Sequence, residues 1–115
     1  MRIQLADNIG YYIDDHEFIG CAGGLCVIGI DSDGNVRGCE SLKDDRFIEG
    51  NLKTQTLKDI WNNENNFLYN RKFTPRLLTG KCADCEYGMV CAGGCRSHNF
   101  FSHNKLYEST VCARF

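Results

Sequence analysis

The sequence lacks any long apolar stretch. No run of apolar residues approaches the roughly 18 that a membrane-spanning helix needs, and 24% of the 115 residues are charged. The first fifteen residues contain no apolar segment of the kind found in a secretory signal peptide. We therefore expect a soluble, cytoplasmic protein without a membrane partner.

A charge imbalance is also missing. Lysine and arginine number 13 against 15 aspartate and glutamate residues, which gives a net charge of -2, and the basic residues form neither a patch nor a run. Proteins that bind nucleic acid neutralise phosphates with clustered Lys and Arg. Nucleic acid is therefore not expected as a partner.

No acid–base site stands out either. His16, His98 and His103 are isolated in the sequence, and a functional histidine needs a positioned partner. Asp14 and Asp15 are adjacent, but the side chains of neighbouring residues need not converge. The sequence therefore assigns no catalytic residue.

Cysteine, by contrast, is abundant. Eight cysteines follow the spacing C-x4-C-x12-C, a long cysteine-free segment, and then C-x2-C-x5-C-x3-C-x16-C. An even number also fits a disulfide framework, but no export signal is visible, and thiols stay reduced outside an oxidising compartment. We therefore expect two metal sites of four thiolates each. The two groups of cysteines are Cys21, Cys26 and Cys39, and Cys82, Cys85, Cys91, Cys95 and Cys112.

The choice of metal depends on how the cysteines are spread. Both zinc sites and iron–sulfur clusters use a C-x2-C pair. Structural zinc sites usually combine two short pairs, whereas here the remaining cysteines span longer arcs that suit a bulky cluster better. Paired glycines also stand beside cysteines, at Gly23-Gly24 and Gly93-Gly94, where the backbone must approach closely and take positive φ. The spacing favours iron and sulfur and leaves a zinc-stabilised interaction module as the alternative.

An Asp-Gly turn between two short β-prone arms predicts a β-hairpin. The arms are residues 27–30 and 36–39, and Cys26 and Cys39 stand at their bases. The aspartates of the turn resemble a calcium-binding loop, but its sixth position holds Val36 rather than glycine. A calcium site is therefore not expected.

Helical periodicity follows the hairpin. A capping-box-like start at Thr56 and apolar residues at helical spacing before Pro75 predict one amphipathic helix over residues 56–71. A second, short helix is expected over residues 96–103, and a strand with a connection over residues 1–20. The expected fold class is a small, cysteine-rich α+β domain organised around two iron–sulfur clusters, with cluster-binding loops after the hairpin and helix.

The cysteine pattern closely resembles that of the SPASM domain, the C-terminal auxiliary-cluster domain of radical S-adenosylmethionine (SAM) peptide and protein maturases. In that family a cysteine, nine to fifteen residues, a glycine, four residues and a second cysteine come first, and Cys21, Gly34 and Cys39 fit. C-x2-C-x5-C-x3-C and a final cysteine then follow, as they do here. Residues 50–52, leading into residues 56–61, are similar to the inter-cluster segment of the family.

The eighth cysteine, Cys26, makes the chain most similar to anaerobic sulfatase-maturating enzymes, in which both auxiliary [4Fe–4S] clusters have four cysteine ligands. Spacing alone would instead group the four cysteines between residues 82 and 95 at one centre. The resemblance implies two interleaved ligand sets: Cys21, Cys26, Cys39 and Cys95 for the first cluster, and Cys82, Cys85, Cys91 and Cys112 for the second.

The C-x3-C-x2-C motif that binds the SAM cluster in radical SAM enzymes is missing. Its nearest approach, Cys91-x3-Cys95-x2-His98, has histidine at the third position. We therefore expect a chain that is not catalytic alone, either a split C-terminal domain or a stand-alone accessory module, with SAM bound only by a separate barrel domain. Residues 1–20 would be the remnant of a link to that barrel, and residues 21–115 the SPASM-like domain.

The resemblance also implies a function. Clusters with four cysteine ligands are suited to moving electrons, so the chain is expected to serve electron transfer and substrate docking in a radical SAM maturase of peptides or proteins. The implied partners are a radical SAM catalytic domain or protein, a peptide or protein substrate, and a ferredoxin or flavodoxin. A stand-alone ferredoxin-like carrier is a further alternative.

Overall fold

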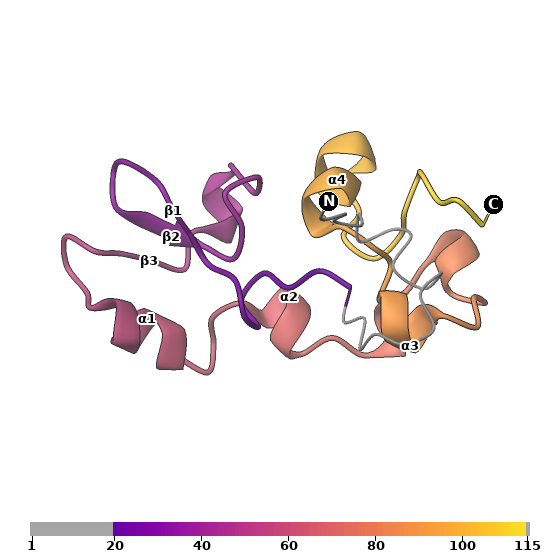
Figure 1. The fold of residues 1–115 in the computed structure, drawn as a ribbon, viewed down its shortest axis with the longest axis horizontal. Coiled ribbons are helices and arrows are strands. Elements are labelled where there is room, and N and C mark those ends of the chain that lie inside the picture. Colours follow the sequence, from indigo (N-terminus) through magenta and orange to yellow (C-terminus); the bar gives the residue numbers. More distant parts are fainter. Residues whose placement is uncertain (1–19, 115) are drawn as a thin grey trace, which may run out of the picture. The chain divides into compact units, whose positions relative to one another are not determined.

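The computed structural model describes residues 20–114, which are drawn in colour in Figure 1. The chain divides into two compact units, and each is described by itself. No helix in the described range is long and apolar enough to cross a membrane. The strand predicted near the N-terminus lies outside the described residues. The units are Ala22–Lys72, here called the sheet unit, and Met1–Cys21 with Phe73–Phe115, here called the cysteine-loop unit.

The sheet unit contains a three-stranded antiparallel sheet in the order β1-β2-β3 (Figure 1). Strand β1 is Gly29–Ile30, β2 is Asn35–Arg37 and β3 is Gly50–Asn51. In the register, Val36 faces Ile30 on one side and Gly50 on the other. The predicted hairpin is confirmed with shorter arms, and β3 is an addition that the sequence pattern did not predict.

A small apolar core holds the sheet unit together. The side chains of Val36, Ile60 and Phe67 are fully buried against one another, and the partly buried Ile28 and Trp61 pack on them. Full burial of such a side chain contributes about 1.5–3 kcal/mol of hydrophobic free energy. This core joins the central strand to the helical segment that follows the sheet.

The helical segment consists of two short helices, α1 (Leu57–Asn62) and α2 (Leu68–Arg71). The predicted start is confirmed, because the Thr56 hydroxyl oxygen accepts the backbone N–H of Asp59 at 3.1 Å. The prediction of one continuous helix over residues 56–71 is wrong. A short 3₁₀ turn, η2 (Asp45–Phe47), precedes β3.

Side-chain hydrogen bonds explain the break between α1 and α2. The side-chain oxygen of Asn63 accepts the backbone N–H of Asn65 at 2.9 Å, and the Asn66 amide donates to the Ile60 carbonyl oxygen at 2.9 Å. Asparagine side chains of this kind compete with the helical backbone for its hydrogen-bonding groups. Phe67 then adopts a left-handed φ of 57°, which places its ring in the core but cannot continue a helix.

The described part of the cysteine-loop unit consists of short helices and turns. Its helices are α3 (Gly88–Cys91) and α4 (Arg96–His103), so the helix predicted over residues 96–103 is confirmed. Two 3₁₀ turns precede them, η3 (Pro75–Leu77) and η4 (Gly80–Cys82). The buried side chains of its described part include more polar than large apolar groups: Cys21, Leu78, Ala92, Arg96, Ser97 and Asn99. The protein is thus a small, cysteine-rich α+β chain, as predicted.

Candidate metal centres

All eight cysteines lie among the described residues, and none of them forms a disulfide. Cys21 is buried, Cys26 is exposed and the other six are partly buried. Thiols in this state can ionise to thiolates, which are the form that ligates metals. The donor chemistry required for an iron–sulfur cluster is therefore present in both units.

The second predicted ligand set lies wholly in the cysteine-loop unit. Burial raises the pKa of Cys82, and the nearby thiolates of Cys85 and Cys112 raise it further. Burial likewise raises the pKa of Cys91, with Cys82 and Cys112 adding to the effect. Each thiolate makes its neighbours harder to ionise, and a bound cationic iron centre would remove that penalty. These four side chains therefore form one electrostatically connected group.

Local turns place these cysteines. Cys82 ends η4, and the backbone N–H of Cys85 donates to the carbonyl oxygen of Cys82 at 3.3 Å. The N–H of Gly88 then donates to the carbonyl oxygen of Cys85 at 3.0 Å as α3 begins. Cys91 ends α3. The C-x2-C pair therefore lies on a tight turn, three residues before the helix that carries the next cysteine.

Backbone N–H groups donate to cysteine sulfurs in the described part of the unit. Ser109 donates to Sγ of Cys82 and His98 donates to Sγ of Cys95, each at 3.5 Å. The second contact makes Cys95 the N-cap of α4, where the helix N-terminus favours negative charge. Hydrogen bonds to sulfur stabilise a thiolate and help set the potential of iron–sulfur clusters, so these contacts fit cluster ligation.

The cysteines of the sheet unit lie on two turns. Cys26 belongs to a turn in which three successive N–H groups converge on the carbonyl oxygen of Ala22 at 3.0 to 3.2 Å. Cys39 follows β2, and its Sγ accepts the backbone N–H of Ser41 at 3.4 Å. The first predicted ligand set combines these two residues with Cys21 and Cys95 and stays a prediction.

A run of left-handed residues joins Cys91 to Cys95. Ala92, Gly93 and Gly94 have φ values of 53°, 81° and 80°. Glycine adopts this region without cost, whereas a residue with Cβ loses about 1–2 kcal/mol there. The positive φ predicted for glycines beside the cysteines is thus confirmed in this loop, which we call the Ala92–Gly94 loop.

Arg96 was missed by the sequence reasoning, although it directly follows a predicted ligand. Its side chain is 1% exposed, and its guanidinium donates to the carbonyl oxygens of Ala92 and Leu106. The guanidinium carbon lies 4.6 Å from the ring centre of Tyr107 and 5.3 Å from that of Phe73. Burial of an arginine is not visible in a sequence, so only its place in Gly-Gly-Cys-Arg could have drawn attention to it.

The charge of Arg96 lies near cysteines. Burial lowers the pKa of the guanidinium, while nearby Cys21, Tyr107, Cys91 and Cys95 act in the opposite direction when ionised. Arginine nevertheless remains protonated in proteins. A fixed positive charge therefore lies among three of the predicted cluster ligands.

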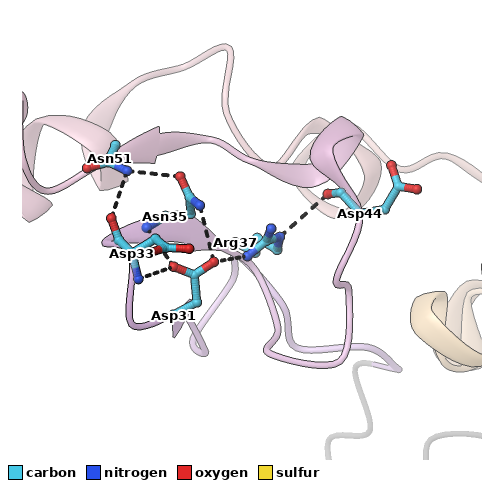
Figure 2. Close-up of polar contacts among 6 residues, drawn as sticks. All are labelled: Asp31, Asp33, Asn35, Arg37, Asp44 and Asn51. Atoms are coloured by element: carbon cyan, nitrogen blue, oxygen red, sulfur yellow. Dashed lines mark hydrogen bonds and ion pairs between the residues drawn. The ribbon is translucent and has the colours of Figure 1, made fainter.

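Nitrogen donors form hydrogen bonds to the aspartate-rich turn of the hairpin (Figure 2). The Asp31 carboxylate accepts backbone N–H groups of Asp33 and Asn35 at 2.9 and 3.0 Å and a guanidinium N–H of Arg37 at 2.7 Å. The hydrogen bond from Arg37 is the largest cause that lowers the pKa of Asp31 to about 2. This carboxylate therefore stabilises the hairpin by pairing with Arg37.

Within residues 20–114, no three His, Cys, Asp or Glu side chains are placed to hold a single metal ion. Four thiolates around one zinc ion, with Zn–S bonds of about 2.3 Å, would lie about 3.8 Å from one another. Metal analysis of the protein directly distinguishes zinc ligation from iron–sulfur ligation.

Comparisons with known proteins agree with the donor chemistry. Residues 21–86 match the family model SPASM, described as an iron–sulfur cluster-binding domain. The chain is 36% identical to the AdoMet-dependent heme synthase of Oleidesulfovibrio alaskensis, over 92% of this chain and 25% of that protein. It is 30% identical to the mycofactocin maturase MftC of Mycolicibacterium smegmatis, over 71% of this chain and 20% of that protein. The chain thus spans a quarter or less of the length of these relatives.

The fold also has a counterpart among solved structures. The crystal structure of SuiB from Streptococcus suis superposes with a TM-score of 0.60, covering 90% of this chain and 25% of that one at 22% identity. At this identity the likeness concerns the fold alone.

Proposed function

Because the chain belongs to the SPASM family of iron–sulfur cluster-binding domains, which occur in radical SAM maturases, we propose that it is the auxiliary cluster domain of a radical SAM enzyme. It holds two [4Fe–4S] clusters and serves electron transfer and substrate docking. The proposed ligands are Cys21, Cys26, Cys39 and Cys95 for the first cluster, and Cys82, Cys85, Cys91 and Cys112 for the second.

The observation that carries the proposal is the connected cysteine group of the cysteine-loop unit. Burial raises the pKa of Cys82 and Cys91, and neighbouring thiolates raise it further, so ionising the whole group is unfavourable unless a bound iron centre compensates the negative charge. An N–H donor to Cys82 adds the hydrogen bonding expected at a cluster sulfur. The small apolar core of the described part of this unit is consistent with a cluster that contributes to its stability.

The cysteines and the N–H groups near them have separate roles. A four-iron cluster, when bound, accepts and donates one electron at a time. The cysteines fix its position, while N–H groups such as those of Ser109 and His98 stabilise the charge on sulfur. Because every proposed iron site has a cysteine ligand, substrate chemistry belongs to a separate radical SAM catalytic domain, and a ferredoxin or flavodoxin would exchange electrons with the system.

The proposed substrate is a peptide or protein. This assignment is supported by MftC, which is named a maturase, and by a pocket of about 250 Å³ in the sheet unit. Charged side chains of both signs line the pocket, including Arg37, Glu40 and Lys43. Such a surface can meet the amides and charged groups of a peptide, and we propose it as the docking site.

A second candidate substrate class comes from the other relative. The chain is 36% identical to part of a protein named heme synthase, so the same type of domain could serve an enzyme that acts on a tetrapyrrole precursor of heme. A binding measurement distinguishes the two substrate classes. A peptide maturase domain binds its substrate peptide less tightly after Lys43→Glu but not after Lys53→Glu, whereas a heme synthase domain binds an iron porphyrin and no peptide.

The cluster assignment is tested by electron paramagnetic resonance of the anaerobically reconstituted chain after reduction with dithionite. Two one-electron clusters predict about two spins per chain with the relaxation behaviour of four-iron centres. A chain that binds metal but gives no such signal, even after complete reduction, would contradict the proposal.

A further inference from the structure

Arg96 places a permanent positive charge inside the cysteine-loop unit. Its side chain is 1% exposed, and its donors are directed at carbonyl oxygens of Ala92 and Leu106. The guanidinium also lies against the rings of Phe73 and Tyr107. These contacts hold the side chain in place, and the guanidinium stays protonated.

Three predicted cluster ligands lie near this charge. Arg96 follows Cys95 directly and donates to the carbonyl of the residue after Cys91, so two ligands flank its contacts in the chain. Cys21 also interacts with it electrostatically. Cys21 and Cys95 belong to the first proposed ligand set, and Cys91 belongs to the second.

We propose that Arg96 sets the reduction potentials of the auxiliary clusters, raising that of the first cluster more than that of the second. This inference rests on the proposed function, because it requires that the two clusters are bound. Arg96 acts through space on the ligands, as a positioning and charge-compensating residue, and is not itself a ligand or a catalytic group.

The physical reason is the charge balance of reduction. Adding one electron to a cluster adds one negative charge to the cluster and its thiolates. A fixed cation nearby stabilises that extra charge, and it does so more strongly in a buried site than in water because the effective dielectric constant is lower. Charge and burial are among the factors that set iron–sulfur potentials. The guanidinium stays protonated, so its positive charge is permanent.

The same side chain also has a structural role, which the experiment must separate from the electrostatic one. Arg96 ties the Ala92–Gly94 loop to Leu106 through hydrogen bonds. Arg96→Lys retains the charge and loses part of the hydrogen bonding. Arg96→Met retains much of the apolar stem and loses the charge, so the two variants separate the effects.

The test is a redox titration of the full chain, reconstituted without oxygen and followed by electron paramagnetic resonance. For Arg96→Met we expect at least a tenfold fall in the reduced-to-oxidised ratio of one cluster at its wild-type midpoint, which is about 59 mV for one electron. Arg96→Lys should retain potentials close to wild type. Arg76→Gln removes an exposed arginine of the same unit and should leave both potentials unchanged.

The cluster with the larger shift should be the one whose signal disappears on replacing Cys95. Arg96→Met with wild-type iron and sulfide but unchanged potentials would overturn this inference alone. Wild-type protein that holds no iron and sulfide would overturn the proposed function as well.

A third variant is used if Arg96→Met loses its clusters. Arg96→Gln is neutral but keeps side-chain N–H donors for the same carbonyls. Loss of iron from both neutral variants, with retention and normal potentials in Arg96→Lys, would support a requirement for the charge. Loss from all three would overturn the inference and leave Arg96 with a structural role.

Discussion

The side-chain amide of Asn99 donates a 2.7 Å hydrogen bond to the carbonyl oxygen of Gly93, in the left-handed loop between Cys91 and Cys95. The same amide donates to the carbonyl oxygen of Leu106 at 3.1 Å. Asn99 is fully buried, and its amide gives both carbonyl oxygens a donor that is not water, which at Leu106 adds to the one from Arg96. A residue of α4 thereby holds the loop that connects cysteines of the two proposed ligand sets.

Replacing Asn99 with Asp should destabilise the protein strongly. The change keeps the shape but removes both donors and sets a carboxyl group against the carbonyl oxygens of Gly93 and Leu106. We expect the free energy of unfolding to fall by about 2–4 kcal/mol, measured as a lower midpoint of thermal unfolding of the reconstituted chain. Asn65→Asp makes the same chemical change at an exposed position and should have little effect. Equal losses in the two variants would contradict this role.

Gly93→Ala should also destabilise the loop. Gly93 has a φ of 81°, and a Cβ there would lie 3.0 Å from the carbonyl carbon and oxygen of Tyr107. The left-handed conformation alone costs an alanine about 1–2 kcal/mol. Ala92→Gly is the matched control, because Ala92 already has a φ of 53° and glycine relieves its strain. Thermal unfolding should rank Gly93→Ala below wild type and Ala92→Gly near it, and the reverse order would refute this account.

The ion pairs of the sheet unit should be visible in a carboxyl titration. The pKa of Asp31 is lowered to about 2 mainly by Arg37, and that of Asp44 to about 2 mainly by Arg46. Arg37→Gln should therefore raise the pKa of Asp31 most, and Arg46→Gln that of Asp44. Carboxyl ¹³C chemical shifts followed by NMR measure both values, and each variant serves as the control for the other. Unchanged midpoints in both variants would rule out the pairing.

The sign of the pH dependence follows from these values. The folded-state pKa of Asp31, about 2, lies below the unfolded value of about 3.9. Its contribution to stability is therefore fully present above about pH 4 and is lost as the pH falls through about 2. Within the neutral range the pair should make no pH-dependent contribution.

The interleaved ligand sets can be tested with two single replacements. Cys95→Ala and Cys112→Ala should remove different cluster signals from the electron paramagnetic resonance spectrum, because the two residues belong to different proposed sets. Iron content should fall in both. Loss of the same signal in both variants would instead place the two cysteines at one cluster.

Several elements of the fold could be predicted because their signals are local. The Asp-Gly turn forms the hairpin between β1 and β2, and helix α4 has the bounds expected from the sequence. The capping of α1 by Thr56 is equally local, since donor and acceptor are three residues apart. In these cases nearby residues determine the hydrogen bonds.

The rest depends on contacts that periodicity does not reveal. Strand β3 contains only two residues, and Asn51 is held by the distant carbonyl oxygen of Asp33 and the side chain of Asn35 (Figure 2). The break before α2 depends on the Asn66 amide and on a left-handed Phe67. Helical spacing of apolar residues continues through this break, so the pattern alone predicts one helix.

The candidate site shows the same division. Cysteine identity and spacing led to the family, and the comparisons confirm it. The burial of Arg96 beside cysteines, and the support of the loop by Asn99, depend on tertiary packing. A sequence shows which side chains are present but not which of them lie in the interior.

The most direct test of the account is the metal and sulfide content of the chain, purified and reconstituted without oxygen. Two four-iron clusters predict about eight irons and eight acid-labile sulfides per chain, with a brown colour. About two zinc ions per chain and no sulfide would contradict the account and identify a structural zinc module.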